Sequence, residues 1–505
     1  MKKILLLVLL LPAIAGWSQK KANPTVYAKT ITADDLKKHL YIVASAEMEG
    51  RETASPGQKK AAAYIETQFR SLGLQPGNKG EYQMIYPVYQ DSMTGASVEV
   101  NGVTFSLDKD FTLNPGQSSN ATYRFAEVVF AGNGLVDSLH DDYKGLDVRG
   151  KVVLLLPAQQ QQGQGGGGGR GFGGNPRADA AWKNGALAVL TIGQGFPRSQ
   201  KTQVKGNMYV NAFSRSIRPN QFTISEKIAE AIMGADYAQA KSGTVAPKTY
   251  PANVMLSFSK AVTNLQSSNV LGFLEGTDLK DEFVFVTGHY DHLGKRDTVI
   301  FYGADDDGSG TVSVLELAEA FTKAKAEGHG PRRSMIFMTV SGEEKGLWGS
   351  DYYTSHPVYP LDKTTVDLNI DMIGRLDPNR KEGDSTNYVY VVGDDKVSSD
   401  LKPISEGNNK KFTKMELDYK YNDPKDPQRI YFRSDHYNFA KNGVPIIFYF
   451  DGIHKDYHRP TDTPDKINYD VMAKRAQLVF YTAWEMANRD QMLKRDIKLE
   501  APRGF

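Results

Sequence analysis

The sequence predicts an α/β fold with a mostly parallel mixed sheet flanked by helices and an inserted β-rich domain. From about Asn269 onward, long apolar runs alternate with helix-like stretches, as they do when helices connect parallel strands. Between residues 104 and 258, short β-type runs alternate with turns instead. The chain has 505 residues, which is too long for one ordinary domain.

The first residues predict a secretory signal peptide. Lys2 and Lys3 precede an apolar run from Ile4 to Ala15, and Ser18 follows among small residues. The run is too short to span a bilayer. We therefore expect residues 1–18 to be removed, the mature chain to be periplasmic or extracellular, and no stable membrane anchor to remain.

Composition narrows the partners and the possible metal ligands. The formal net charge is +2, so the chain has no strong field for nucleic acid. It contains no cysteine, which excludes disulfides and disfavours a lipid-anchored export signal. Any metal must then be bound through nitrogen and oxygen. The oligomeric state is left open.

Hydrophobic periodicity gives the order of the elements. We expect residues 28–103 to form the N-terminal part of a catalytic domain, with a helix from Pro56 to Leu74 ended by Gly73. Residues 104–258 form the insertion, residues 259–490 the main catalytic part, and residues 491–505 a C-terminal tail. Within the insertion we expect strands at Glu127–Ala131, Lys151–Leu156 and Ala186–Ile192, and a helix at Ala178–Asn184.

A run of Gln and Gly from Gln159 to Gly174 interrupts the insertion. Such a composition cannot bury a core, so we expect a mobile loop. A phosphate-binding glycine loop would need a following Lys-Ser/Thr pair or a strand-to-helix switch, and neither is present.

The main catalytic part carries strands that each lead into polar residues. A helix is expected after Ser309, which can cap it. In open parallel sheets, sites form at the carboxyl ends of the strands. The expected strands are Phe283–Thr287, Met335–Val340, Val366–Ile370 and Val444–Phe450.

Five residues in these loops form a candidate metal-ligand set. Two histidines and three carboxylates suit two divalent cations of the zinc type. Glu343 stands beside one of the carboxylates and is placed to act as the general base for a metal-activated water. The pattern predicts a metallohydrolase. The candidate ligands are His289, Asp306, Glu344, Asp371 and His458.

Each of these features has a simpler interpretation when it is taken alone. A strand-end histidine is more often a surface or core residue, and an acidic loop such as Asp305–Asp307 is usually a solvated turn. That loop is not an EF-hand, because the alternating acids and the closing Glu are missing. The order and placement of all five residues together favour the metal site.

The region from Val286 to Lys466 resembles the di-zinc exopeptidase family of bacterial leucyl-type aminopeptidases and glutamate carboxypeptidase. The segment YKGLDVRGK at 143–151 resembles part of a protease-associated domain, which would be the insertion. The family motifs are GHYDHLG at 288–294, GADDDGSG at 303–310, GEEKGLWGS at 342–350, IDMIG at 370–374 and YHRPTDTPDK at 457–466.

The resemblance implies a ligand arrangement. By matching position, His289 and Asp371 would hold one zinc ion, and Glu344 and His458 the other. Asp306 would bridge the two ions. Manganese or cobalt could take the place of zinc.

The resemblance also implies catalytic roles. Asp291 would orient the first histidine, and Glu343 would take the proton of a water activated by the two zinc ions. Tyr457 would help to stabilise the oxyanion. Asp306 would have a cis peptide bond to Asp307, a rare and costly conformation outside proline.

Four activities remain open at this stage. A secreted aminopeptidase acting on peptides is favoured. A carboxypeptidase of the same family would need cationic groups, for which Arg332, Arg375 and Arg433 are candidates. A glutaminyl cyclase resembles a one-zinc site, which the full ligand set disfavours. A receptor-like binding protein would have lost catalysis.

Overall fold

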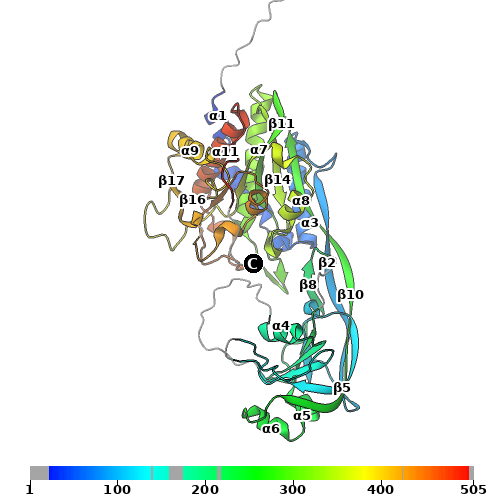
Figure 1. The fold of residues 1–505 in the computed structure, drawn as a ribbon. Helices are drawn as coiled ribbons and strands as arrows, with labels where there is room; N and C mark the ends of the chain where they lie inside the picture. Colours follow the sequence, from blue (N-terminus) through cyan, green and yellow to red (C-terminus); the bar gives the residue numbers. More distant parts are fainter. Residues whose placement is uncertain (1–21, 138–139, 158–174, 213–217, 424, 500–505) are drawn as a thin grey trace, which may run out of the picture. The chain divides into compact units, whose positions relative to one another are not determined.

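The computed structural model describes residues 22–137, 140–157, 175–212, 218–423 and 425–499. The predicted signal peptide (1–18) and the Gln/Gly run (159–174) lie outside the described residues. The chain divides into two compact units, each described by itself below. One contains the residues up to Tyr86 and from Ser267 onward, and the other runs from Pro87 to Gln266 (Figure 1).

The sheet of the first unit has four parallel strands at its centre. In order across the sheet, the strands are β17, β16, β18, β15, β11, β14 and the last part of β10. The strands β18, β15, β11 and β14 are parallel, and β10 and β16 are antiparallel to their neighbours β14 and β18. The bounds are β1 Gln75–Pro76, β10 Lys248–Leu274, β11 Leu279–His289, β12 Lys295–Arg296, β13 Val299–Ile300, β14 Arg333–Val340, β15 Thr364–Ile370, β16 Tyr388–Val392, β17 Glu416–Asp418 and β18 Ile446–Phe450.

Alternation along the central strands places apolar side chains on both faces of this sheet. In β11, Val284 and Val286 join one core, and Phe283 and Phe285 join the other. Strands that are buried on both faces read as continuous apolar runs, which is why they can be found in the sequence.

Helices cover the two faces. The core with Val284 also contains residues of α2, α3, α7 and α11, and the core with Phe285 contains residues of α8 and α10. The helices of this unit are α1 Pro24–Ala28, α2 Ala33–Val43, α3 Pro56–Ser71, α7 Gly310–Ala326, α8 Trp348–Ser355, α9 Leu401–Asn408, α10 His436–Ala440 and α11 Tyr469–Asn488. The short helical turns are η1 Ala46–Arg51, η3 Ala304–Ser309, η4 Glu343–Lys345, η5 Leu361–Lys363, η6 Asn409–Thr413, η7 Lys420–Asn422, η8 Ile430–Phe432 and η9 Pro464–Lys466.

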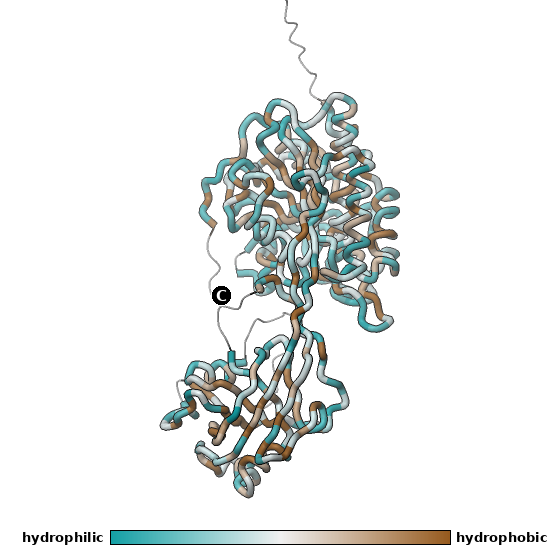
Figure 2. Tube along the Cα trace, turned by 90° about the vertical axis from the view of Figure 1, so that its right-hand side faces the viewer, coloured by the Kyte–Doolittle hydropathy of each residue, from teal (hydrophilic) through white to brown (hydrophobic). Residues whose placement is uncertain are grey.

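The second unit has its own core, and its strands belong to the same hydrogen-bonded sheet as those of the first unit, continued through β10. Its strands lie in the order β10, β5, β6, β7, β9 and β4, and β5, β6, β7 and β9 are parallel. Hydrophobic segments occur in both units in Figure 2, in keeping with a separate core in each. The elements are β2 Gln83–Val100, β3 Val103–Phe105, β4 Phe111–Leu113, η2 Pro115–Gln117, β5 Ala121–Phe130, β6 Val152–Leu155, α4 Pro176–Lys183, β7 Ala188–Ile192, β8 Lys205–Tyr209, β9 Asn220–Ile224, α5 Glu226–Met233 and α6 Asp236–Lys241.

The bounds of this unit, 87–266, differ from the segment 104–258 expected from composition. Its assignment as a protease-associated domain stays a prediction. In the described part of the chain, no helix is both long and apolar enough to cross a membrane.

Candidate metal centre

The ends of the four parallel strands carry four of the five predicted ligands, and the loop before α7 carries the fifth. His289 is the last residue of β11, and Asp371 directly follows β15. Glu344 lies in η4 after β14, and Asp306 lies in η3 before α7. His458 comes from the loop after β18. The sequence therefore places each ligand on a different segment, and the sheet gathers them at one edge.

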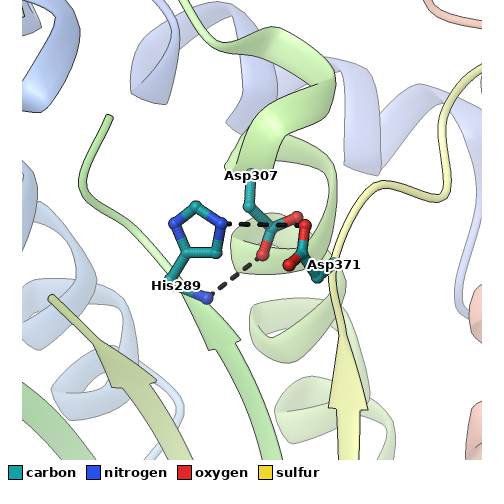
Figure 3. A group of neighbouring side chains, drawn as sticks. All are labelled: His289, Asp307 and Asp371. Carbon is teal, nitrogen blue, oxygen red and sulfur yellow. Dashed lines mark hydrogen bonds and ion pairs between the residues drawn. The ribbon is translucent and has the colours of Figure 1, made fainter. Parts of the chain in front are cut away.

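One half of the centre is built around His289. Its Nε2 lies 3.3 Å from Asp306 Oδ1 and 3.7 Å from Asp371 Oδ1. Glu343 Oε2 is 3.9 Å from the same nitrogen. Figure 3 shows His289 and Asp371 approaching one another from neighbouring strands, with Asp307 between them.

The other half is built around His458 and Glu344. His458 Nε2 lies 3.0 Å from Asp306 Oδ2 and 3.3 Å from Glu344 Oε2. The two oxygens of Asp306 thus face different histidines, as a bridging carboxylate requires. His292 lies here too, with Nδ1 2.8 Å from Glu344 Oε1.

The donor set fits zinc. His289 Nε2 is buried and makes no hydrogen bond among the described residues, although carboxylate oxygens surround it. Carboxylates this close repel one another unless a cation lies among them. Nitrogen and oxygen donors without sulfur remain compatible with zinc.

Asp307 supports the centre through the backbone. Its carboxylate accepts hydrogen bonds from the backbone N–H groups of His289 (3.1 Å), Gly310 (2.8 Å) and Met372 (3.1 Å). It thereby ties together β11, α7 and the segment after β15. The Asp306–Asp307 peptide bond is cis, as the family resemblance implies.

Asp291 contacts both the first histidine and the proposed base. His289 Nδ1 lies 3.1 Å from the backbone oxygen of Asp291, an arrangement that leaves Nε2 for a metal when Nδ1 carries the proton. The Asp291 carboxylate accepts hydrogen bonds from Thr53 Oγ1 (2.6 Å) and from the backbone N–H of Glu343 (3.2 Å). Its orienting role stays a prediction, and the structure adds the link to Glu343.

Ser309 does not cap α7 with its side chain, contrary to the sequence expectation. Its Oγ donates to the backbone oxygen of Asp305 and accepts from the N–H of Ile373. The hydroxyl therefore connects η3, which carries Asp306, to the segment after β15 instead of capping the helix.

The sequence does not reveal the role of one residue of the centre, and it places another near the site but outside the ligand set. Arg51 is fully buried and donates hydrogen bonds to the backbone oxygens of Tyr290 and Gly303. Tyr290 follows the ligand candidate His289, and Gly303 precedes η3, which carries Asp306. Burial lowers its pKa to about 10. The other is His292, which the sequence analysis leaves out of the ligand set. The signal available in the sequence was the second histidine of the segment HYDH at 289–292.

The adjacent glutamates have opposite electrostatic surroundings. Burial raises the pKa of Glu343 well above its usual value, and the negative charges of Glu344 and Asp371 add to this. Burial and Asp306 also oppose ionisation of Glu344, but contacts with His292 and His458 lower its pKa to about 2. The carboxylate of Glu344 is thus kept ionised, as a metal ligand would need to be, whereas Glu343 holds a proton readily.

A pocket opens beside the centre. Tyr457 lies at its wall, where its ring stacks on His458 at a centroid distance of 3.8 Å. The Tyr457 hydroxyl accepts a hydrogen bond from Arg433 Nη2 at 2.9 Å. Acidic and apolar side chains both line the pocket, whose lining residues are Asp306, Glu343, Asp371, Met372, Ile430, Arg433, Phe448, Phe450, Ile453 and Tyr457.

Comparison with known proteins adds a family. Residues 269–483 match the family described as Peptidase family M28, and this segment contains every predicted ligand and Glu343. Aminopeptidase YwaD of Bacillus subtilis is 25% identical over 263 residues, which are 48% of this chain and 50% of that protein. A probable leucine aminopeptidase of Trichophyton verrucosum is 31% identical over 214 residues, which are 41% of this chain and 55% of that protein. The chain thus spans about half the length of these curated relatives.

Solved structures share the fold. An aminopeptidase from Aneurinibacillus sp. strain AM-1 superposes with a TM-score of 0.56 at 20% identity, covering 94% of this chain and 99% of that chain. The zinc aminopeptidase BSAP from Bacillus subtilis gives 0.52 at 19% identity, covering 93% and 99%. The mixed α/β fold with a mostly parallel sheet flanked by helices is that of zinc aminopeptidase structures.

Proposed function

Because residues 269–483 belong to peptidase family M28, we propose that the chain is an exported di-zinc aminopeptidase that removes N-terminal residues from peptides. The observation that carries this proposal is an acidic cluster with zinc-type donors beside an apolar pocket. Export is proposed from the N-terminal sequence alone.

The residues that would hold the two ions follow from the contacts. His289 lies near Asp371 and one oxygen of Asp306, and His458 lies near Glu344 and the other oxygen of Asp306. Bound there, zinc would polarise the scissile carbonyl and lower the pKa of a water molecule.

Glu343 is the proposed general base. It lines the pocket, it is not needed to complete the five-residue ligand set, and its pKa is raised by burial. A carboxyl with a raised pKa can take a proton from the attacking water and return it to the leaving amine. Asp291 holds the backbone of Glu343 in place through its carboxylate.

Tyr457 is the proposed oxyanion donor. It reaches the pocket beside His458, and Arg433 donates to its oxygen, so its own O–H remains available to a substrate. A fixed donor aimed at developing negative charge stabilises the transition state.

The charges around the pocket favour an amino terminus over a carboxyl terminus. Asp306, Glu343 and Asp371 present negative charge to a substrate ammonium group. Among the described residues that line the pocket, Arg433 is the single cation, and it already donates to Tyr457.

The other two arginines considered for a carboxypeptidase do not line the pocket. Arg332 pairs with Asp278 and Asp490, and Arg375 pairs with Asp456. The apolar wall, with Phe448 and Phe450, suits an aliphatic or aromatic side chain on the residue that is released.

The test uses leucyl-glycyl-glycine in free, N-acetylated and C-amidated forms, with the mature chain and added zinc. We expect N-acetylation to lower kcat/KM by about 100-fold or more, because it removes a charged hydrogen-bonding group, while C-amidation has little effect. The opposite pattern would identify a carboxypeptidase. If zinc binds and none of the three peptides is cleaved, the cyclase and the receptor-like interpretations take precedence.

A further inference from the structure

His292 is placed like a metal ligand although it is outside the five-residue set. It is fully buried, and its Nδ1 lies 2.8 Å from Glu344 Oε1 and 3.8 Å from Asp306 Oδ2. His292, Asp306 and Glu344 form one of the two groups of buried side chains among the described residues that could hold an ion.

The ring of His292 has no other polar partner in the part of the chain that the structure describes. Neither of its nitrogens makes a hydrogen bond there, despite complete burial. Buried polar groups are nearly always satisfied, and an ion between Nδ1 and the carboxylates of Glu344 and Asp306 would satisfy these groups.

The surrounding backbone makes room for this ring. Gly303 has a positive φ of 54°, and a Cβ at that position would lie 2.4 Å from His292 Cγ. The backbone N–H of His292 donates a hydrogen bond to the backbone oxygen of Arg51 at 3.2 Å. This bond holds His292 in position. His292 and His458 meet edge to face with ring centroids 5.9 Å apart.

We propose that His292 Nδ1 is a direct ligand of the ion held by Glu344 and His458. This inference rests on the proposed di-zinc function and extends it. The second ion then has four protein ligands, namely Asp306, Glu344, His458 and His292. The first has three, namely Asp306, Asp371 and His289.

The difference in ligand number gives the two ions different roles. Four protein ligands close a zinc site, as in structural centres, whereas three leave a position for water or substrate. The first position also lies beside Glu343, whose Oε2 is 3.9 Å from His289 Nε2. The ion beside His292 should therefore bind more tightly and the ion beside Glu343 should accept the reacting water.

The test is zinc binding by the metal-free full chain, measured by competition with a chromophoric chelator and by metal content after gel filtration. The variants are His292→Ala and His292→Asn. The Asn amide can donate a hydrogen bond to Glu344 in place of Nδ1–H but is a poor zinc ligand. His39→Asn is the control, because His39 is partly buried in the same unit, where its ring contacts Tyr64 and Glu316.

We expect the wild type and His39→Asn to bind two zinc ions. Both His292 variants should lose the tighter phase, with a Kd for that ion raised by at least about 100-fold, more than the loss of a hydrogen bond to a ligand usually causes. Thermal unfolding of the metal-free variants identifies any variant that fails to fold. If one His292 variant does not fold, zinc binding by the other tests the inference.

Two results would overturn the inference. If His292→Asn keeps wild-type affinity, the imidazole only positions Glu344. If both variants bind two ions unchanged, His292 has no role in binding. A wild type that binds no zinc would instead contradict the proposed function itself, so the two failures are distinguishable.

Discussion

At the scale of single residues, Glu343 and Glu344 show how the fold divides two identical side chains between two tasks. Glu344 lies between His292 and His458, whose contacts lower its pKa to about 2. Glu343 lies at the pocket, where burial and neighbouring acids raise its pKa. One is suited to hold a cation and the other to exchange a proton.

Replacing Glu343 by Gln should separate chemistry from metal binding. The amide has the same shape but cannot accept a proton, so we expect kcat to fall by about 100- to 10,000-fold while two zinc ions remain bound. The matched control is Glu52→Gln, because the carboxylate of Glu52 pairs with Lys345 near the same loop. The measurements are steady-state hydrolysis of a leucyl amide and zinc content. A Glu343→Gln variant with near wild-type kcat would remove Glu343 from the mechanism.

The residue types of the centre could be predicted, but not all of its contacts. His289 and Asp371 stand at the ends of apolar strands, and Asp306 stands in an acidic, Gly-rich loop that opens a helix, which makes all three visible in the sequence. Arg51 is separated from His289 by more than two hundred residues, and its hydrogen bonds go to backbone oxygens, which leave no pattern of side-chain types. His292 was visible in the motif, but its approach to Glu344 depends on the space left by Gly303.

At the scale of elements, the parallel strands were predictable because both of their faces are buried. The runs that predicted β14 and β15 differ from the observed strands only at their starts. Ser309 was predicted less well. Propensity favours a serine cap, but the hydroxyl is used by Asp305 and Ile373, a demand that arises only in the folded chain.

The packing of α7 against α2 buries a carboxyl group and should make stability depend on pH. Burial, with the charges of Glu319 and Asp35, raises the pKa of Glu316 from 4.5 to about 8. His39 Nε2 is 3.5 Å away, and burial lowers the pKa of that imidazole, so it offers little compensating charge. Between pH 4.5 and about 8, the folded state binds the proton that the unfolded state has released. The contribution of Glu316 to stability is therefore greatest below this window and falls as the pH rises through it, by up to about 1.4 kcal/mol per pH unit.

Glu316→Gln should remove this dependence. We expect the free energy of unfolding in urea to change less between about pH 5 and about pH 8 in the variant than in the wild type. The two changes should differ by on the order of 1 kcal/mol or more. Glu81→Gln is the control, since Glu81 is exposed in the same unit and is not among the charges that act on Glu316. Equal pH dependence in the wild type and Glu316→Gln would show that Glu316 titrates normally.

At the scale of the whole molecule, the chain separates a metal-binding unit from a second unit with its own core. The fold class could be predicted from the change of hydrophobic pattern along the sequence. The change of unit at Tyr86 and at Gln266 could not, because both points fall inside continuous strands, β2 and β10. The residue types typical of strands continue across both points, so the sequence does not mark the boundary between the units.

We propose that zinc bound by the five candidate ligands around Asp306 makes this chain a peptidase. The most direct measurement is a zinc titration of the metal-free mature chain, following bound zinc and the release of N-terminal leucine in the same samples. We predict no release without zinc and a rise in release that saturates as two ions bind. Full activity in the metal-free chain, or two bound zinc ions without any release, would contradict the account.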